Sequence, residues 1–505
     1  MLRPSAQSRR ARALEQCLAG ARALQLGNTE AGLRCYMAGV TLAPDDADVA
    51  ALHGVALRSA ARLPDAQREL IRAIALDPSR PDTFTQLAQT YRMAGDRTQA
   101  AQAFLAAAVL RPTDAVAWRD AAESLRLADR LQDGLNAAAR AAALAPDDPS
   151  IANTTALLLH RNGQLDEALA LCEQARSVVP DDLHLTLTHG ALLRTFERYD
   201  GGWALYERRL ELPEFAQRPN APHSLRWNGN SLYGRHILVR AEQGLGDQIQ
   251  FVRWANLLRA HGAAQVTVQA APTLVRLLRT LAHVDSVVPS DLPTPRHHVH
   301  VDMGSLPYLL RTGSNMCTQL VPYLQLPERG IDAKHALPAR TDGVMRIGIV
   351  WGGSPLQEDN RFRSIPLALL APALLRPDVQ VVILQQGPAR AQLETLAPAT
   401  RHSFLDAAID CVDMADTALI ASQCDIVLSV CTSVVHLAGA LGLPTWVMLA
   451  SPAEWRWGQR RTDSMFYPTL RLFRQQRGGD WHSVLDQLRR AIDQWHTMLP
   501  SSAHS

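Results

Sequence analysis

A short glycine-containing loop carries the first residues that could do chemistry. Its six residues, EQGLGD at 242–247, lie between an apolar run, HILVRA, and a helix-like segment, QIQFVRWANLLRA. Gly244 and Gly246 would let the backbone turn tightly and approach a ligand, with Glu242 at the start of the loop. Asp247 would open the helix, where a carboxylate can take a proton from an acceptor hydroxyl or simply cap the helix. Spacing alone leaves both roles open.

A second segment, DIVLSVCTSVVHLAGALGLP at 425–444, reads as a buried strand, a small-residue loop and a helix. The free N–H groups and the dipole of such a helix end favour a phosphate. Thr432 and Ser433 would add hydroxyl donors, and His436 would lie on the first turn. A histidine there could reach the same ligand or could be a packed structural residue.

A third segment, WGGSPLQEDNRFRSIPLALL at 351–370, follows the apolar run RIGIVW. Its small residues predict a flexible loop at the carboxyl end of a strand: Gly352, Gly353 and Ser354. Arg361 and Arg363 could hold an anionic ligand, because guanidinium matches phosphate geometry. The alternative is a solvated cluster of surface charges.

Two other groups have weaker chemical meaning. Trp455, Arg456 and Trp457 would stack on a base or sugar, or bury against the last helix of the chain. His298 and His300 are two apart, so in a strand both would lie on one face and could bind a metal. No third ligand is evident beyond Asp302 on that face, and we expect no metal site.

These segments need parallel sheets to bring them together. From residue 236, short β-branched runs alternate with helical segments, which is typical of βαβ units. We expect a Rossmann-like half at 236–340 and a second at 341–505, joined by a hinge at 337–344 and closed by a terminal helix. Ligands bind such sheets at the carboxyl ends of the strands, so a cleft between the halves should hold the site.

The chain before residue 211 has a different pattern, a 34-residue repeat that fits stacked helical hairpins. Five prolines mark the period: Pro44, Pro78, Pro112, Pro146 and Pro180. Glycine or alanine occupies three further positions of each unit, headed by Gly20, Gly32 and Gly39, as close helix crossings require. Gly27, Gly95 and Gly163 suit the turn within a hairpin, and the residue after each proline suits a helix cap. We expect a repeat array at 10–210 and a surface linker at 211–235.

Bulk properties fit an ordinary multidomain protein. The 505 residues suggest about three domains, and a net charge of +2 favours neither nucleic acid nor a membrane surface. Apolar runs are strand-sized, so we expect neither a membrane-spanning segment nor a secretory leader. Seven cysteines without a CxxC pair indicate reduced thiols and a cytoplasmic location.

Together these motifs resemble a known group. The first half resembles the tetratricopeptide repeat family. The segments AEQGLGDQIQF, WGGSPLQEDNRFRSIPL, DIVLSVCTSVVHLAGALGLPTWV and EWRWGQRRTDSMFYPTLRLFRQ look like bacterial tetratricopeptide-repeat proteins fused to a heptosyltransferase-like glycosyltransferase domain. That resemblance implies a GT-B fold of two Rossmann-like halves, and some members glycosylate flagellin or other proteins.

The resemblance also implies roles for particular residues. Asp247 becomes the general base, Arg361 and Arg363 would hold the donor diphosphate, and Thr432, Ser433 and His436 belong to the second-half signature. The chain departs from the family where Cys431 replaces the usual aspartate. At a helix N-terminus this thiol could be partly ionised, but we expect direct displacement without a covalent intermediate.

The sequence therefore predicts an inverting, metal-independent glycosyltransferase. It would move sugar from a nucleotide sugar, its co-substrate, to a protein hydroxyl recruited by the repeats, with no further cofactor. A lipid-linked or lipopolysaccharide acceptor is a variant of this reading. The alternative is a protein-interaction scaffold whose second half is a non-catalytic, degenerate binding domain; Cys431 is its main support.

Overall fold

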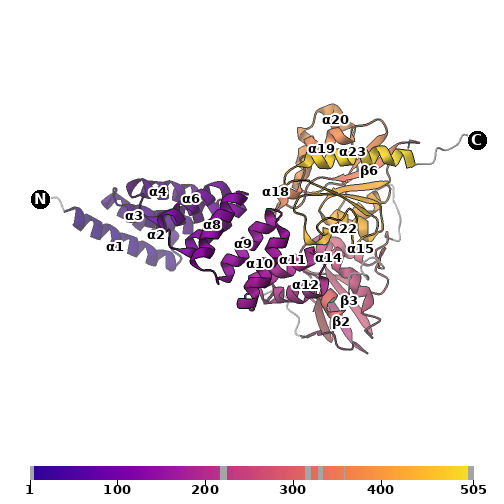
Figure 1. Cartoon of the computed structure of the whole chain (residues 1–505), viewed down its shortest axis with the longest axis horizontal. Helices are drawn as coiled ribbons and strands as arrows, with labels where there is room; N and C mark the ends of the chain where they lie inside the picture. The colour runs from indigo at the N-terminus through magenta and orange to yellow at the C-terminus, as the bar shows by residue number, and fades with distance from the viewer. Residues whose placement is uncertain are drawn as a thin grey trace, which may run out of the picture. The chain divides into compact units, whose positions relative to one another are not determined.

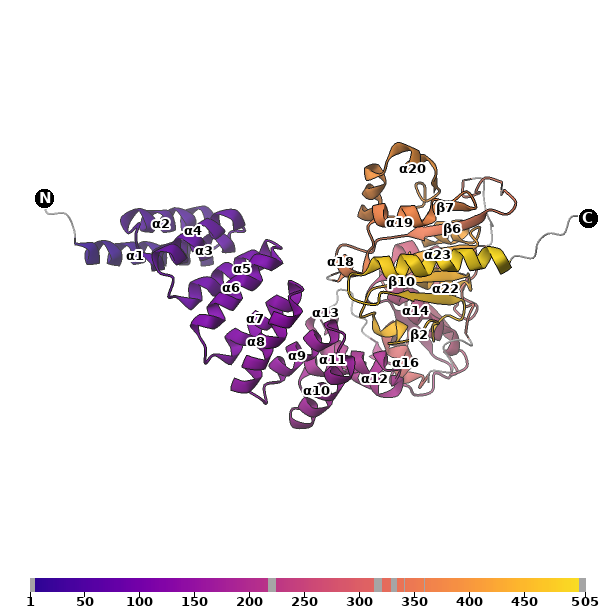
Figure 2. The ribbon, with the colours of Figure 1, turned by 45° about the horizontal axis from the view of Figure 1, so that its top comes forward.

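Paired antiparallel helices recur along the first part of the chain (Figures 1 and 2). The structure is a computed structural model that describes residues 5–216, 224–312, 320–327, 334–339, 341–357 and 359–498. It forms two compact units, Met1–His189 and Gly190–Ser505, which are described separately. The helices of the first unit are α1 (Ala6–Gln25), α2 (Thr29–Leu42), α3 (Ala47–Ser59), α4 (Leu63–Leu76), α5 (Pro81–Met93), α6 (Arg97–Leu110), α7 (Ala115–Leu127), α8 (Leu131–Leu144), α9 (Pro149–Arg161), α10 (Leu165–Val178) and the start of α11 (Leu183–Thr195).

In hairpins that have a glycine at one of the two small positions, that glycine lies close to the backbone of the small residue on the paired helix. A Cβ on Gly54 would lie 3.3 Å from the carbonyl oxygen of Ala66, and one on Gly134 would lie 3.4 Å from that of Ala122. The two small positions of the repeat are therefore the crossing point of the paired helices, as the period predicts. The members of both positions are buried: Gly20, Gly54, Ala88, Ala122, Ala156, Gly190, Gly32, Ala66, Ala100, Gly134, Ala168 and Gly202.

The turn inside each hairpin adopts the left-handed conformation in every unit. Gly27, Gly95 and Gly163 have φ of 78°, 80° and 80°. The alternate units place non-glycine residues there, with Ala61 at φ 58° and equivalent residues at Asp129 and Glu197. Only the glycines of these turns could be predicted from the sequence, because an alanine, aspartate or glutamate does not by itself indicate a left-handed backbone.

We expect Ala61→Gly to stabilise the first unit by about 0.5–1 kcal/mol. The left-handed conformation costs an L-residue roughly 1–2 kcal/mol, and the greater freedom of glycine in the unfolded chain cancels part of the gain. Gly95→Ala should destabilise the unit by a similar amount through backbone strain alone. No steric clash adds to this cost, because no atom lies within 4 Å of the added Cβ. Urea unfolding followed by far-UV circular dichroism measures both. Unchanged midpoints for the pair would show that these turns carry no strain.

The helix caps lie one residue later than predicted. Asp46, Asp114 and Asp148, each the second residue after its proline, accept hydrogen bonds from the first-turn N–H groups of α3, α7 and α9. The residue directly after each proline belongs to the turn. In the Pro78 unit, Arg80 holds the cap position and makes no side-chain cap bond.

The last helical hairpin belongs to the second unit. It comprises the end of α11 and α12 (Tyr199–Tyr206), followed by η1 (Glu207–Glu211) and α13 (Pro213–Ala216). The buried guanidinium of Arg194 lies 5.2 Å from the ring of Trp203, 4.2 Å from that of Tyr206 and 4.5 Å from that of Trp455. Burial lowers the pKa of Arg194 to about 10, so it remains a cation at neutral pH.

The segment predicted as a surface linker at 211–235 takes part in the fold. It contains β1 (Leu225–Arg226), which pairs with β5 (Val299–Asp302), and the buried side chains of Trp227 and Leu232. These two apolar side chains anchor the segment, so a composition rich in Pro, Asn and Gly was a misleading sign here. Residues 217–223 of the predicted linker lie outside the described residues.

The first α/β half contains a parallel sheet in the order β1-β5-β2-β3-β4. Its other strands are β2 (His236–Arg240), β3 (Gln265–Ala270), β4 (Ser286–Pro289) and β5 (Val299–Asp302). Helix α14 (Leu245–Val252) follows β2, and α15 (Val275–Leu278) follows β3. The strands fall on the predicted apolar runs.

The second half contains a parallel sheet in the order β11-β10-β9-β6-β7-β8. Its strands are β6 (Met345–Val350), β7 (Val379–Ile383), β8 (Leu405–Asp406), β9 (Ile426–Val430), β10 (Thr445–Leu449) and β11 (Leu470–Arg474). The short α18 (Asn360–Arg363) and α19 (Leu367–Leu374) follow β6, α20 (Pro398–His402) precedes β8, and α21 (Met414–Ala421) and α22 (Ser433–Ala440) flank β9. The two-half α/β architecture agrees with the predicted fold class. The two edge strands, β8 and β11, were not predicted.

The terminal helix α23 (Trp481–Met498) covers the second sheet. Its predicted apolar stripe is buried in one cluster with strand residues and α19: Val484, Leu485, Leu488 and Ile492. Within the described residues, no helix is long and apolar enough to cross a membrane.

Candidate functional site

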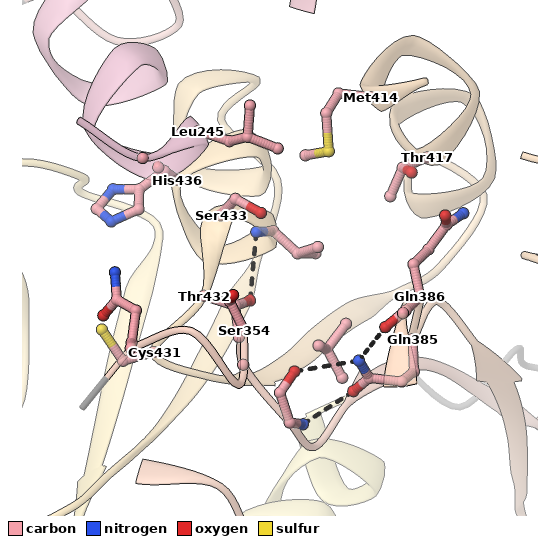
Figure 3. A pocket seen from close by; sticks show the side chains of 18 of the residues that line it. Leu245, Ser354, Gln385, Gln386, Met414, Thr417, Cys431, Thr432, Ser433 and His436 are labelled. Atoms are coloured by element: carbon pink, nitrogen blue, oxygen red, sulfur yellow. Dashed lines mark hydrogen bonds between the residues drawn. The ribbon is translucent and has the colours of Figure 1, made fainter. Parts of the chain in front are cut away.

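In the second sheet, the order in which the chain adds strands reverses between two neighbouring strands, β6 and β9. The chain continues from β6 to β7 and β8 on one side, then returns to β9 on the other. Loops leaving the carboxyl ends of such strands diverge and open a crevice for ligands. A cavity of about 640 Å³ lies there, within the usual range for small-molecule sites. Figure 3 shows its lining side chains.

The loop after β6 forms one wall of the cavity with Gly352, Gly353 and Ser354, as predicted. The Gln385 side chain fixes the loop: its Oε1 accepts from the Trp351 and Gly352 N–H groups at 3.0 and 2.8 Å, and its Nε2 donates to the Gly352 carbonyl at 3.1 Å (Figure 3). A Cβ on Gly353 would lie 2.6 Å from Asn360 Oδ1, so a larger residue would require the Asn360 side chain to move. Gln385 was not predicted as a site residue; it lies two residues beyond the end of β7.

The N-terminus of α22 forms a second wall with Thr432 and Ser433. Thr432 is the N-cap and its hydroxyl accepts from the Val434 N–H at 3.3 Å. First-turn N–H groups lack partners within their own helix and attract anions. Thr432 and Ser433, which the sequence predicts to bind a phosphate, therefore line the same cavity as the glycine loop.

His436 is a buried packing residue at the cavity border. Its Nδ1 lies 2.9 Å from the Tyr467 hydroxyl, and its ring stacks on Trp457 with centroids 5.7 Å apart. Burial, with help from nearby arginines led by Arg456, lowers the pKa of His436 well below its usual value, so the ring is neutral. A Cβ on Gly246 would lie 2.8 Å from this ring, which shows that α14 and α22 pack closely.

Cys431 is a neutral thiol. It is buried, and the Trp457 indole N–H lies 3.2 Å from its Sγ. Burial, reinforced by Glu454, raises the pKa of Cys431 to about 12. The expectation of partial ionisation at the helix N-terminus is wrong, because loss of water outweighs the helix dipole.

The two predicted arginines separate. Arg363 lines the cavity, and its Nη1 donates to Glu454 Oε1 at 3.1 Å. Arg361 is exposed, lies over the Phe362 ring at 4.3 Å and is absent from the cavity lining. The two side chains leave the short α18 in different directions. Of the two arginines, only Arg363 is placed to bind a ligand in the cavity.

Asp247 both caps its helix and lies at the cavity. It is the third residue of α14, and its Oδ2 accepts from the Gly244 N–H at 3.1 Å. Its Oδ1 is bound by the guanidinium of Arg456. Arg456 also donates to Glu454 Oε2 at 2.7 Å. Glu454 was not predicted as a site residue, and Arg456 was predicted only to stack on a base or sugar or to be buried, not to pair with Asp247. Arg456 follows β10, 209 residues beyond Asp247.

Arg456 is held as a cation by this arrangement. Burial lowers its pKa, but the carboxylates of Asp247 and Glu454 together raise the pKa above the ordinary value. Its neighbours Trp455 and Trp457 face protein: Trp455 packs edge-on against Trp203 at 5.3 Å, and Trp457 is fully buried. These contacts are with residues outside α23, the last helix, against which burial was one of the two expected alternatives.

Glu242 does not reach this cavity. It is buried, with Oε1 at 2.6 Å from Arg209 Nη2, and it also accepts from the Gly304 N–H. It lines a separate cavity of about 570 Å³ together with Phe215 and Gln243. Glu242 thus holds the loop in place, and the loop residues that border the main cavity are Gly244, Leu245, Gly246 and Asp247.

The paired histidines do not converge. His300 is buried with its Nδ1 at 2.9 Å from Ser224 Oγ, whereas the exposed His298 accepts from the His236 N–H through its own Nδ1. Burial lowers the pKa of His300 to about 4. Among the described residues, no group of three or more His, Cys, Asp or Glu side chains is arranged to hold a metal ion.

Fold and site define a tetratricopeptide-like helical array followed by a two-half α/β domain with a ligand-sized cavity. No family model matches the chain. Over 319 residues it is 25% identical to Protein FlbA of Caulobacter vibrioides, covering 58% of this chain and 52% of that protein. The chain therefore spans about half the length of this curated relative.

Several solved structures match part of the chain. PilF of Pseudomonas aeruginosa is 18% identical, covering 42% of this chain and 97% of its own, with a TM-score of 0.33. MamA of Desulfovibrio magneticus RS-1 is 16% identical, covering 34% and 97%, with a TM-score of 0.31. YrrB, described as a TPR protein with an unusual peptide-binding site, is 17% identical, covering 35% and 91%, with a TM-score of 0.30.

Proposed function

We propose that the chain is a glycosyltransferase that moves a sugar from a nucleotide-sugar donor to a hydroxyl group of a protein. One observation carries the proposal. A glycine loop, a helix N-terminus with hydroxyl side chains and the guanidinium of Arg363 converge on a cavity, and a carboxylate from the other α/β half lies on the same cavity. The first three are groups that bind a diphosphate.

The donor would lie along the second half. Its diphosphate would contact Gly353, the Thr432–Ser433 helix end and Arg363. These groups supply the positive potential that a leaving diphosphate needs, so the proposed reaction uses no metal ion. The base and ribose would extend toward the loop after β7 and toward α21, which also line the cavity with Gln386 and Thr417 (Figure 3).

Transfer would proceed by one inverting displacement. The acceptor oxygen forms a bond to the anomeric carbon while the bond from that carbon to the diphosphate oxygen breaks. Asp247 takes the hydroxyl proton, and the nucleoside diphosphate leaves with the electron pair. Helical arrays present extended grooves, so we propose that the repeats bind the acceptor polypeptide, for instance a flagellin-type protein.

A non-catalytic scaffold is the second proposal. Two observations favour it: Cys431 is a buried neutral thiol where the similar family has a carboxylate, and both oxygens of Asp247 are already occupied. In this case the repeats would bind a partner and the α/β domain would bind a ligand or a protein without chemistry.

Calorimetry with a panel of ADP, GDP, UDP, CDP and dTDP tests the first step of the enzyme proposal. We expect one of these diphosphates to bind the full chain at micromolar concentration, and others more weakly. Intact-mass analysis of proteins co-expressed with the chain should then reveal a sugar increment. If none of the five binds, the glycosyltransferase proposal fails; binding without any mass increment supports the scaffold.

A further inference from the structure

We propose that Arg456 is a donor-controlled gate on Asp247. In the empty site its guanidinium holds the carboxylate, and donor diphosphate draws it away, so that Asp247 can accept a proton only when donor is present. This inference rests on the proposed function, because it assigns Asp247 as the base and a diphosphate as the ligand.

Four charged side chains form one chain of ion pairs along the cavity wall. Arg363 binds Glu454, Glu454 binds Arg456, and Arg456 binds Asp247. All four line the cavity, and they come from α18, the segment after β10 and α14. Arg456 and Arg363 are 10% and 14% exposed, while Glu454, the link between them, is 36% exposed.

The charges of these four paired side chains cancel. Two guanidinium groups face two carboxylates, so the wall offers little net positive charge to an anion while the pairs are closed. A diphosphate can bind strongly only by replacing a carboxylate as the partner of a guanidinium, since arginine binds either group with similar geometry. The more exposed carboxylate, Glu454, is the one that an entering ligand meets.

An unused donor marks where the phosphate would lie. The Nε of Arg363 is buried and has no hydrogen-bond partner among the described residues. It faces the glycine loop, where a Cβ on Gly353 would lie 3.1 Å from it. Buried donors normally have a partner, so this atom points to a ligand oxygen in the space that glycine leaves open.

The same geometry explains how donor binding reaches Asp247. The Gly244 N–H binds one carboxylate oxygen and the Arg456 guanidinium binds the other, so an acceptor hydroxyl has to compete with Arg456 for the Asp247 carboxylate. Coupling between two sites is reciprocal: a ligand that weakens the Arg456–Asp247 pair binds more tightly once that pair is removed. Throughout, Arg456 keeps its proton, and the acceptor proton goes to Asp247.

This reciprocity gives a test whose sign separates a gate from a structural support. The panel diphosphate that binds the wild-type chain is titrated into the Glu454→Gln and Arg456→Gln variants. We expect Glu454→Gln to raise affinity about 5- to 10-fold, since it frees both arginines, and Arg456→Gln to lower it at least 10-fold. Loss of a merely structural carboxylate would loosen the arginines and weaken binding. Glu394→Gln, which removes an exposed carboxylate paired with Arg401, is the matched control for net charge.

Asp247→Asn provides an independent second arm. It releases Arg456 without changing side-chain size and should also raise diphosphate affinity, by several-fold; it carries the test if Glu454→Gln unfolds. Unchanged or weaker binding by folded variants overturns the gate and leaves the glycosyltransferase proposal standing. Absence of any binding to the wild-type chain overturns the glycosyltransferase proposal itself.

Discussion

Asp247→Asn should reduce sugar transfer by about 100- to 10,000-fold, the range supplied by a positioned general base. The amide keeps the size of the carboxylate, and its oxygen can still accept from the Gly244 N–H, so the start of α14 is preserved. It cannot take the acceptor proton. The expected signature is a fall in turnover together with an increased diphosphate affinity, measured by transfer assay and calorimetry on the same preparation.

A control for capping accompanies this variant. Asp114→Asn alters a helix-capping aspartate in the repeat array and touches no cavity residue, so it should leave turnover unchanged. If Asp247→Asn transfers sugar at the wild-type rate, the carboxylate is only a cap and another group accepts the proton. If the wild-type chain binds nucleotide but transfers nothing, the scaffold proposal is supported instead.

Arg363→Gln should lower affinity for the nucleoside diphosphate by about 10- to 100-fold. Hydrogen bonds to charged groups contribute roughly 1.5–3 kcal/mol each, and this guanidinium is the cavity arginine nearest the glycine loop. Its loss leaves Glu454 still paired with Arg456, so no unpaired charge is buried. Equilibrium titration of the preferred diphosphate measures the change.

Arg361→Gln is the matched control, because it makes the same substitution two residues away in the same short helix. Its side chain is exposed and does not line the cavity, so we expect affinity within twofold of wild type. Equal losses in the two variants would mean that general positive potential, rather than a built site at Arg363, attracts the ligand.

The repeat array was predictable in detail because its determinants are local and periodic. Small residues recur where the two helices of one hairpin cross, as at Gly54 and Ala66. The two contacting residues are close together in the sequence, within a single hairpin. The α/β strands were predictable for a similar reason: each is a short apolar run bounded by polar residues. Departures occurred where this local signal is weak, at β1 and at edge strand β11.

The candidate site was predictable only in part. Loops after β6 and β9 could be chosen because parallel strands place their carboxyl ends together, and both do line the cavity. Which side chains of the predicted loops reach the cavity could not be predicted from the sequence. Arg361 and Arg363 have the same chemistry in the sequence, yet α18 turns only one toward the cavity. Glu242 reads as a cleft acid but is buried against Arg209.

The amino-acid sequence alone was thus sufficient to predict the architecture, most of the strands and several of the loops that border the site, because these follow from the hydrophobic periodicity and from the alternation of strands and helices. Only the tertiary structure decided which side chains meet. Asp247 and Arg456 are 209 residues apart, and their ion pair forms because α14 of one half and the segment after β10 of the other face the same cavity. The fate of Cys431 is also a tertiary matter: burial beside Trp457 keeps the thiol neutral, which a helix N-terminus alone would not predict.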